Sequence, residues 1–145
     1  MTIEIKTEII IHANIEKVWS IITDFKNYPN WNPFIKSING DVKVDNIITV
    51  RIEPPESKGM TFKPKVLSYD ANKKLSWLGH LFFPGLFDGE HKFEVVDNGN
   101  GSTTFLQSEI FNGILIPLFK KELRINTKNG FENMNNKLKE LAEQR

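Results

Sequence analysis

Cysteine is absent from this 145-residue chain. Its absence excludes disulfide bridges, thiolate-bound zinc and a cysteine nucleophile. Long apolar runs are missing too, because no stretch reaches the roughly 18 apolar residues that a transmembrane helix requires. The segment 1–6 contains an acidic residue and no apolar signal-peptide core. We therefore expect a cytoplasmic protein with no integral membrane segment.

An excess of one charge sign is also lacking. Nineteen basic residues face 18 acidic ones, for a formal net charge of +1, whereas nucleic-acid binders usually carry a clustered basic excess. The three histidines, His12, His80 and His91, lack metal-ligand spacing, and no glycine-rich phosphate loop occurs. We expect no nucleic-acid partner, no metal and no cofactor.

Apolar residues make up 39% of the chain and charged residues 26%, which is typical of a globular protein. The length fits one domain spanning 1–145, with a substantial core. Eleven phenylalanines and three tryptophans are many for this length. They predict an interior with wide, flat apolar surfaces.

The hydrophobic pattern predicts an α+β fold. Apolar and polar residues alternate over Thr2–His12, as in a half-buried strand. Asn14 then stands at a helix N-cap position, and a second helical turn follows near Asp24–Pro29. Six further strand-like runs are separated by short turns, which favours an antiparallel meander; they are Phe34–Ile38, Ile47–Glu53, Thr61–Tyr69, Lys74–Gly79, Gly89–Val96 and Thr103–Phe111.

Apolar residues recur at helical spacing from Phe119 to Leu141, which predicts a long C-terminal helix. It is the only element long enough to cover a seven-stranded sheet. The sheet is therefore expected to curve around this helix and leave a tapered space between them. Gly130, a poor helix former, is interpreted as a point where a bulky group approaches the helix.

Several sequence blocks carry a family resemblance. They are Val18-Trp19, Asp24-Phe25 with Tyr28, Trp31-Asn32-Pro33-Phe34, Leu75–Gly79, Gly89–Phe93, Glu109–Gly113 and Met134–Lys139. In this order they resemble the polyketide cyclase/dehydrase-like branch of the START-like (SRPBCC) superfamily. The resemblance implies the helix-grip fold: a curved antiparallel sheet around a C-terminal helix, with two short helices after the first strand. The superfamily holds pollen allergens, lipid-transfer domains, aromatic-ring cyclases and chaperone activators, so function stays open.

His91 and Glu109 are the candidate catalytic residues. Alternation places His91 with Phe93 on an inward strand face, and Glu109 with Phe111 on another, unless Leu106 and Ile110 face the core instead. Hairpin pairing puts His91 opposite Glu109, or opposite Gln107 after a slip of two. Such a pair could serve as acid and base or satisfy itself as a buried pair. A direct hydrogen bond would raise the pKa of His91.

Aromatic side chains of the predicted inner faces are expected to line an apolar pocket or to fill the core. Two apolar loops, Leu81–Phe87 and Ile114–Leu118, share one end of the meander with Pro54–Gly59, where they form either a mouth or a plug. The complete predicted ligand-binding set is Trp31, Phe34, Phe62, Trp77, Phe83, Phe87, His91, Phe93, Gln107, Glu109, Phe111, Phe131, Met134 and Asn135.

Three hypotheses follow. The first is a binding protein for a small hydrophobic molecule, such as a lipid, an aromatic or a polyketide-like compound. The second is a cyclase or dehydratase that uses His91 and Glu109. The third is a protein-interaction module in which the pocket is incidental and the protein partner is unknown. We favour the first, in which no catalytic residue is assigned.

Overall fold

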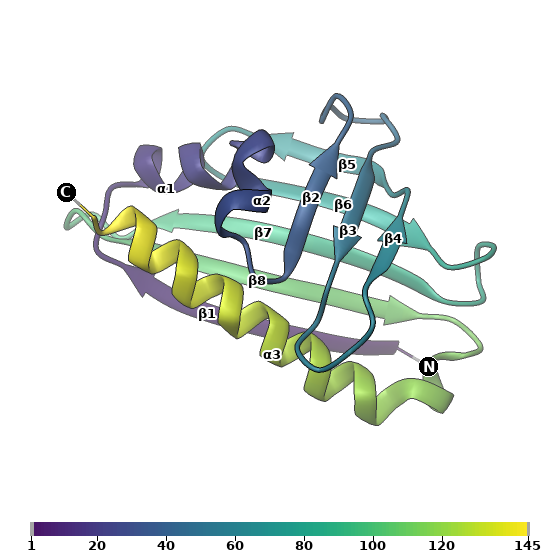
Figure 1. The fold of residues 1–145 in the computed structure, drawn as a ribbon. Coiled ribbons are helices and arrows are strands. Elements are labelled where there is room, and N and C mark those ends of the chain that lie inside the picture. The colour runs from purple at the N-terminus through teal and green to yellow at the C-terminus, as the bar shows by residue number, and fades with distance from the viewer. Residues whose placement is uncertain (1, 145) are drawn as a thin grey trace.

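A computed structural model describes residues 2–144, and Figure 1 shows its long C-terminal helix lying across a twisted sheet. The elements follow in the predicted order, with two short helices and a 3₁₀ turn after the first strand. Their bounds are β1 Thr2–Ile11, α1 Ile15–Ile22, η1 Phe25–Asn27, α2 Tyr28–Trp31, β2 Ile35–Asn39, β3 Thr49–Ile52, β4 Met60–Phe62, β5 Lys65–Asp70, β6 Lys74–His80, β7 Asp88–Asp97, β8 Thr103–Asn112 and α3 Ile116–Ala142.

The strands form two antiparallel sheets rather than the single seven-stranded sheet expected. One sheet has the order β1-β8-β7-β6-β5 and the other β2-β3-β4. The run Thr61–Tyr69, predicted as one strand, is divided at Pro64 into β4 and β5, because proline cannot donate to a strand ladder. Backbone hydrogen bonds from Asp45 to Val66 and from Ile48 to Pro64 still join the two sheets along this break.

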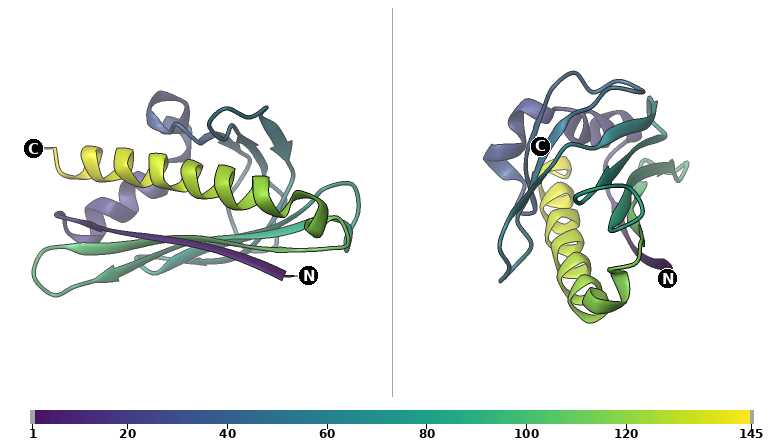
Figure 2. Two further views of the ribbon diagram at one scale, coloured as in Figure 1. Left: turned by 90° about the horizontal axis from the view of Figure 1, so that it is seen from below. Right: turned by 90° about the vertical axis from the view of Figure 1, so that its right-hand side faces the viewer.

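Helix α3 forms a separate layer over the five-stranded sheet, as the left view of Figure 2 shows. Its C-terminal half buries Phe131, Met134 and Leu138 completely. Its N-terminal half leaves Leu118 and Ile125 exposed. The apolar stripe along this helix is therefore unevenly covered.

Two asparagines set the local geometry before β2, and the sequence predicted the first of them, Asn14, as a helix cap. The Asn14 side chain accepts a hydrogen bond from the Lys17 amide at 2.9 Å and so caps α1. The Oδ1 atom of Asn32 accepts bonds from the amides of Phe34 and Ile35, at 2.9 and 2.8 Å. Phe34 is thereby held against Gly130 of α3, where a Cβ atom would overlap the Phe34 ring. The interpretation of Gly130 is confirmed.

Strand register decides which side chains face α3. The β7–β8 pairing places His91 opposite Glu109, and β6–β7 pairing places Trp77 opposite His91. Two residues further along, Gly79 of β6 pairs with Gly89 of β7, which in turn pairs with Phe111 of β8. The inward orientation of Phe105 and Phe111, both buried, is confirmed. Within residues 2–144, no helix has both the length and the apolarity to cross a membrane.

Candidate functional site

A cavity of about 450 Å³ lies between the sheets and the N-terminal half of α3. Its walls are mostly apolar and come from β3, β4, β8, α3 and four loops. This volume falls in the range of pockets that hold small organic ligands, about 300–1,000 Å³. The lining residues are Phe34, Ile52, Pro54, Ser57, Lys58, Met60, Phe62, Leu81, Phe82, Phe87, Glu109, Phe111, Leu115, Phe119, Glu122, Leu123, Asn126 and Thr127.

The apolar loops surround this cavity as a rim. The amides of Ile114 and Leu115 donate hydrogen bonds to the carbonyl groups of Gly85 and Leu86, at 3.1 and 3.0 Å, which ties the two loops together. Their inner residues line the cavity, whereas Ile114 is 75% exposed and Phe82, at the cavity edge, is 79% exposed. The shared end predicted from the meander is confirmed, and the loops do not plug the cavity.

The structure divides the predicted ligand-binding residues into three groups. Those that line the cavity are Phe34, Phe62, Phe87, Glu109 and Phe111. Trp77 borders a small extension of about 30 Å³ that shares several of the same walls. The residues that lie outside the cavity are Trp31, His91, Phe93, Gln107, Phe131, Met134 and Asn135, all buried in the core, and Phe83, whose side chain is exposed.

These core residues were wrongly predicted to line the cavity. Alternation shows which side chains of a strand face inward, but not whether the interior next to them is filled. Phe131 packs edge-on against Phe34, with ring centroids 5.6 Å apart, and against His91 at 5.5 Å. The Trp77 ring stacks on the other side of His91 at 4.7 Å. These contacts leave no space at the level of His91, so the predicted cavity wall of Phe131 and Met134 is solid core.

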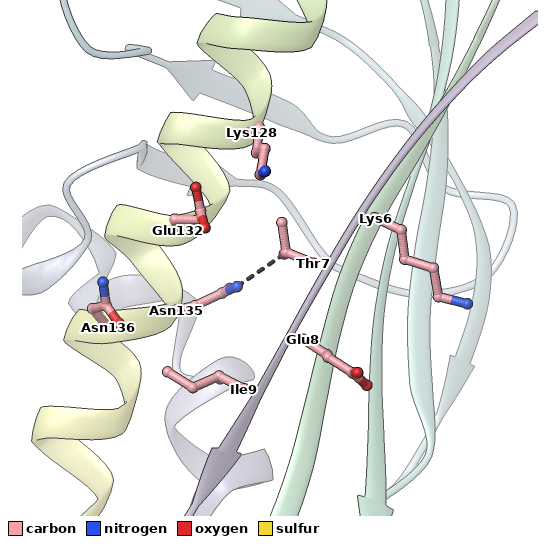
Figure 3. A pocket seen from close by; sticks show the side chains of 8 residues that line it. All are labelled: Lys6, Thr7, Glu8, Ile9, Lys128, Glu132, Asn135 and Asn136. Atoms are coloured by element: carbon pink, nitrogen blue, oxygen red, sulfur yellow. Dashed lines mark hydrogen bonds between the residues drawn. The ribbon is translucent and has the colours of Figure 1, made fainter.

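A chain of buried polar side chains crosses the core at this level. His91 Nε2 donates to Gln107 Oε1, Gln107 Nε2 donates to Asn135 Oδ1, and Asn135 Nδ2 donates to Thr7 Oγ1, each at 2.9 Å. The Thr7 hydroxyl donates in turn to the Gln107 carbonyl group at 3.1 Å. Figure 3 shows Thr7 and Asn135 facing each other between β1 and α3. This network joins three strands to the helix.

His91 is a neutral core residue and forms no ion pair with Glu109. Burial lowers the pKa of His91 to about 4, although the hydrogen bond to Gln107 acts in the opposite direction. The expected rise in its pKa is therefore wrong. The register was right, but the ring turns toward Gln107. His91 Nδ1 has no hydrogen-bond partner among the described residues, and the ring lies outside the cavity.

Glu109 is the acidic group of the inner cavity wall. Its carboxyl group lies over Gly89, where a Cβ atom would collide with Oε2. The half-buried side chain lines both the cavity and its small extension, so its exposed part faces the cavity. Burial in these apolar surroundings raises the pKa of the carboxyl group to about 8. Glu109 is thus an uncharged acid at neutral pH, able to donate one hydrogen bond and to accept others.

Several lining residues were missed by sequence reasoning. Leu123, Asn126 and Thr127 belong to the helical stripe, but the prediction gave weight only to its C-terminal half. Lys58 and Met60 lie where the β3–β4 turn meets β4, and turn composition carries no signal for which residues face a cavity. Within residues 2–144, no group of three His, Asp or Glu side chains is placed to hold a metal ion.

Solved structures of several kinds share this fold. The Zhui aromatase/cyclase from a Streptomyces species superimposes with a TM-score of 0.80 at 11% identity, covering 100% of this chain and 96% of that chain. Norcoclaurine synthase from Thalictrum flavum, in complex with dopamine and hydroxybenzaldehyde, gives 0.73 at 18% identity, covering 97% and 86%. A START superfamily protein from Mycobacterium smegmatis gives 0.71 at 19% identity, covering 95% and 98%.

At these identities the structural likeness shows the fold, while family membership comes from the sequence. Among curated protein sequences, none matches this chain. The family model described as polyketide cyclase / dehydrase and lipid transport matches residues 2–143. Because this match covers nearly the whole chain, the chain belongs to the polyketide cyclase / dehydrase and lipid transport family.

Proposed function

We propose that this protein binds a small hydrophobic molecule in the cavity between the sheets and α3. The observation that carries the proposal is the cavity itself, about 450 Å³ in volume and lined chiefly by aromatic and aliphatic side chains. An interior of this kind excludes water from an apolar ligand, which is the main source of binding free energy for such compounds. Glu109 supplies a polar group inside this apolar wall, which is how such pockets orient their ligands.

A cavity-filling substitution tests this proposal directly. Leu123 lines the cavity from α3, whereas Ile125, two residues further along the helix, is exposed and lies outside it. The neutral fluorescent probe N-phenyl-1-naphthylamine should bind the parent protein saturably. Leu123→Trp should weaken this binding by about tenfold or more, because the indole ring occupies the ligand volume. Ile125→Trp should leave it unchanged.

The proposal fails if the probe does not bind saturably, or if both tryptophan variants bind it like the parent protein. Circular dichroism of each variant ensures that a loss of binding is not a loss of fold. A collapsed interior would instead support the protein-interaction hypothesis, in which the exposed apolar rim contacts another protein.

The enzyme hypothesis retains one of its two candidate residues. A protonated carboxyl group with a raised pKa can serve as a general acid at neutral pH, and Glu109 has both this property and access to the cavity. His91 contacts neither the cavity nor the Glu109 carboxyl group. A cyclase or dehydratase reaction in this cavity would therefore depend on Glu109 without His91.

A further inference from the structure

Glu109 has no partner among the described residues that would explain its position. Among residues 2–144, no side chain or backbone group makes a hydrogen bond or ion pair with its carboxyl group, and burial alone accounts for its raised pKa. This contrasts with Gln107, on the same face of β8, and with Asn135 of α3, which bond to each other and to their neighbours. Burying an ionisable group without a partner is costly.

The space for this carboxyl group is provided by a pair of glycines. Gly79 and Gly89 are opposite each other on β6 and β7, and both border the small extension of the cavity. A side chain at Gly89 would occupy the position of the Glu109 carboxyl oxygen. The carboxyl group therefore lies in a hollow of the inner sheet face, open to the cavity and surrounded by Trp77, Phe87 and Phe111.

The other charged or titratable groups around the cavity leave Glu109 unpaired. Lys58 and Glu122 line the cavity from the β3–β4 turn and from α3, and neither forms an ion pair with Glu109. His80 is bonded to Asp88 at 2.7 Å. The His91 ring, across the strand pair, is bonded to Gln107 and neutral. The described residues therefore supply no positive charge to the Glu109 carboxyl group.

We propose that the cavity selects a small apolar amine, whose ammonium group pairs with Glu109 while its apolar body contacts Phe87, Phe111 and Leu123. This inference rests on the proposed function and names the class of ligand. An ammonium group offers an opposite charge and three hydrogen-bond donors, and charge-assisted hydrogen bonds are about twice as strong as neutral ones. The carboxyl group is already surrounded by protein, so binding adds little further desolvation, and the cost that remains is the loss of its proton.

Other ligand head groups fit this site less well. An alcohol would make a neutral hydrogen bond with the protonated carboxyl group, which contributes only about 0.5–1.5 kcal/mol. A carboxylate would place a second acid beside Glu109, and the two groups would have to share a proton. The amine alone turns the unpaired acid into a paired charge.

Amine binding must also release a proton. The carboxyl group is protonated at neutral pH, and an alkyl ammonium group, with a pKa of about 10.4, keeps its proton on binding. Pairing therefore transfers the Glu109 proton to solvent, so up to one proton leaves for each amine bound. The affinity should rise with pH until the carboxyl group ionises without ligand, at about pH 8.

Isothermal titration calorimetry with three matched probes tests the inference. The probes are 4-phenylbutylamine, 4-phenylbutan-1-ol and 4-phenylbutyrate, which share one apolar body and differ in the head group. At about pH 7 the amine should bind the parent protein about tenfold more tightly than the alcohol. Titrations in phosphate and in Tris, which differ in ionisation enthalpy, should show close to one proton released for the amine and none for the alcohol.

Glu109→Gln keeps the shape of the side chain and removes its charge. In this variant the amine should bind no more tightly than the alcohol and should release no proton. Glu90→Gln is the matched control, because Glu90 follows Gly89 on β7 but faces away from the cavity and does not line it. It should keep both the preference for the amine and the proton release.

The inference is overturned if the parent protein binds the alcohol or the butyrate at least as tightly as the amine, if no proton is released, or if Glu109→Gln keeps the preference. Binding of the alcohol and of N-phenyl-1-naphthylamine without a gain for the amine would refute this inference alone. Binding of none of these compounds would refute the proposed function as well.

Discussion

The two halves of α3 cover the same sheet, but one half packs tightly against it and the other leaves a cavity. Beneath the C-terminal half, Phe131, Met134 and Leu138 fill the interior completely. Beneath the N-terminal half, Leu123 and Thr127 border a cavity of about 450 Å³. One helix on one sheet thus borders both a filled core and a cavity.

The polar groups of the two regions differ in the same way. In the filled half, hydrogen bonds link His91, Gln107, Asn135 and Thr7 across three strands and the helix, although His91 Nδ1 has no partner among the described residues. In the hollow half, Glu109 forms no hydrogen bond or ion pair with the described residues. A buried polar group that is paired internally supports the fold. The Glu109 carboxyl group differs from His91 Nδ1 because it faces the cavity, and for this reason we propose it as the group that a ligand contacts.

Trp77→Ala should have the largest effect, because it removes the aromatic stack at the border of the two regions. Trp77 is 4% exposed, stacks on His91 at 4.7 Å and packs edge-on against Phe93 at 5.8 Å. Truncation of a buried aromatic side chain costs about 3–5 kcal/mol in unfolding free energy. Urea denaturation measures this loss. A loss below about 1 kcal/mol would mean that the filled half does not depend on this stack.

Asn135→Ala should cause the next largest loss of unfolding free energy, because it breaks the chain of buried polar side chains and leaves Gln107 Nε2 without an acceptor. An unsatisfied buried group costs about 1–3 kcal/mol. The matched control is Asn136→Ala, on the exposed side of the same helix turn, which gains the same helix propensity and should change stability by no more than about 0.5 kcal/mol. Equal denaturation midpoints for the two variants would show that the chain does not stabilise the fold.

The strands, helices and pairing register of this fold could be predicted from sequence because they depend on local patterns. Alternation placed Ile3, Ile5 and Ile11 inward, and all three are buried. The boundary between core and cavity could not be predicted in this way. It depends on how far Phe34 and Phe131 extend into the interior, which is set by contacts between elements distant in sequence. The same reason explains why His91 was assigned to the site.

The stability of the protein should depend on pH through one acid and one base with opposite signs. Glu109, with its pKa raised from 4.5 to about 8, binds more protons in the folded state than in the unfolded state, so its contribution falls as pH rises across this interval. His91, with its pKa lowered from 6.5 to about 4, binds fewer protons when folded, so its contribution rises with pH up to 6.5. From pH 6.5 to 8 the Glu109 effect is the larger of the two.

Urea denaturation of the parent protein and of Glu109→Gln between pH 6.5 and pH 8 isolates this acid. The unfolding free energy of the parent protein should decline over the interval, and Glu109→Gln should remove the decline. Glu90→Gln should keep it. A parent protein with constant stability over this interval would show that Glu109 is ionised in the folded state at neutral pH.

Phe82→Ala should have the smallest effect, at the outer rim of the hollow region. Phe82 is 79% exposed, so its truncation should change the unfolding free energy by no more than about 0.5 kcal/mol. Because the side chain still contacts the cavity, N-phenyl-1-naphthylamine should bind slightly more weakly to this variant. A large loss of stability would mean that the rim belongs to the folded core.

Gly130 has a consequence for how relatives of this protein can vary. Alanine would favour the helix by about 1 kcal/mol over glycine, but its Cβ atom would overlap the Phe34 ring. Local preference and tertiary contact therefore conflict at this position. A residue larger than glycine fits only where the aromatic ring at position 34 is replaced by a smaller side chain. The two positions should then change together among homologous sequences, so that one substitution is accepted only in company with the other.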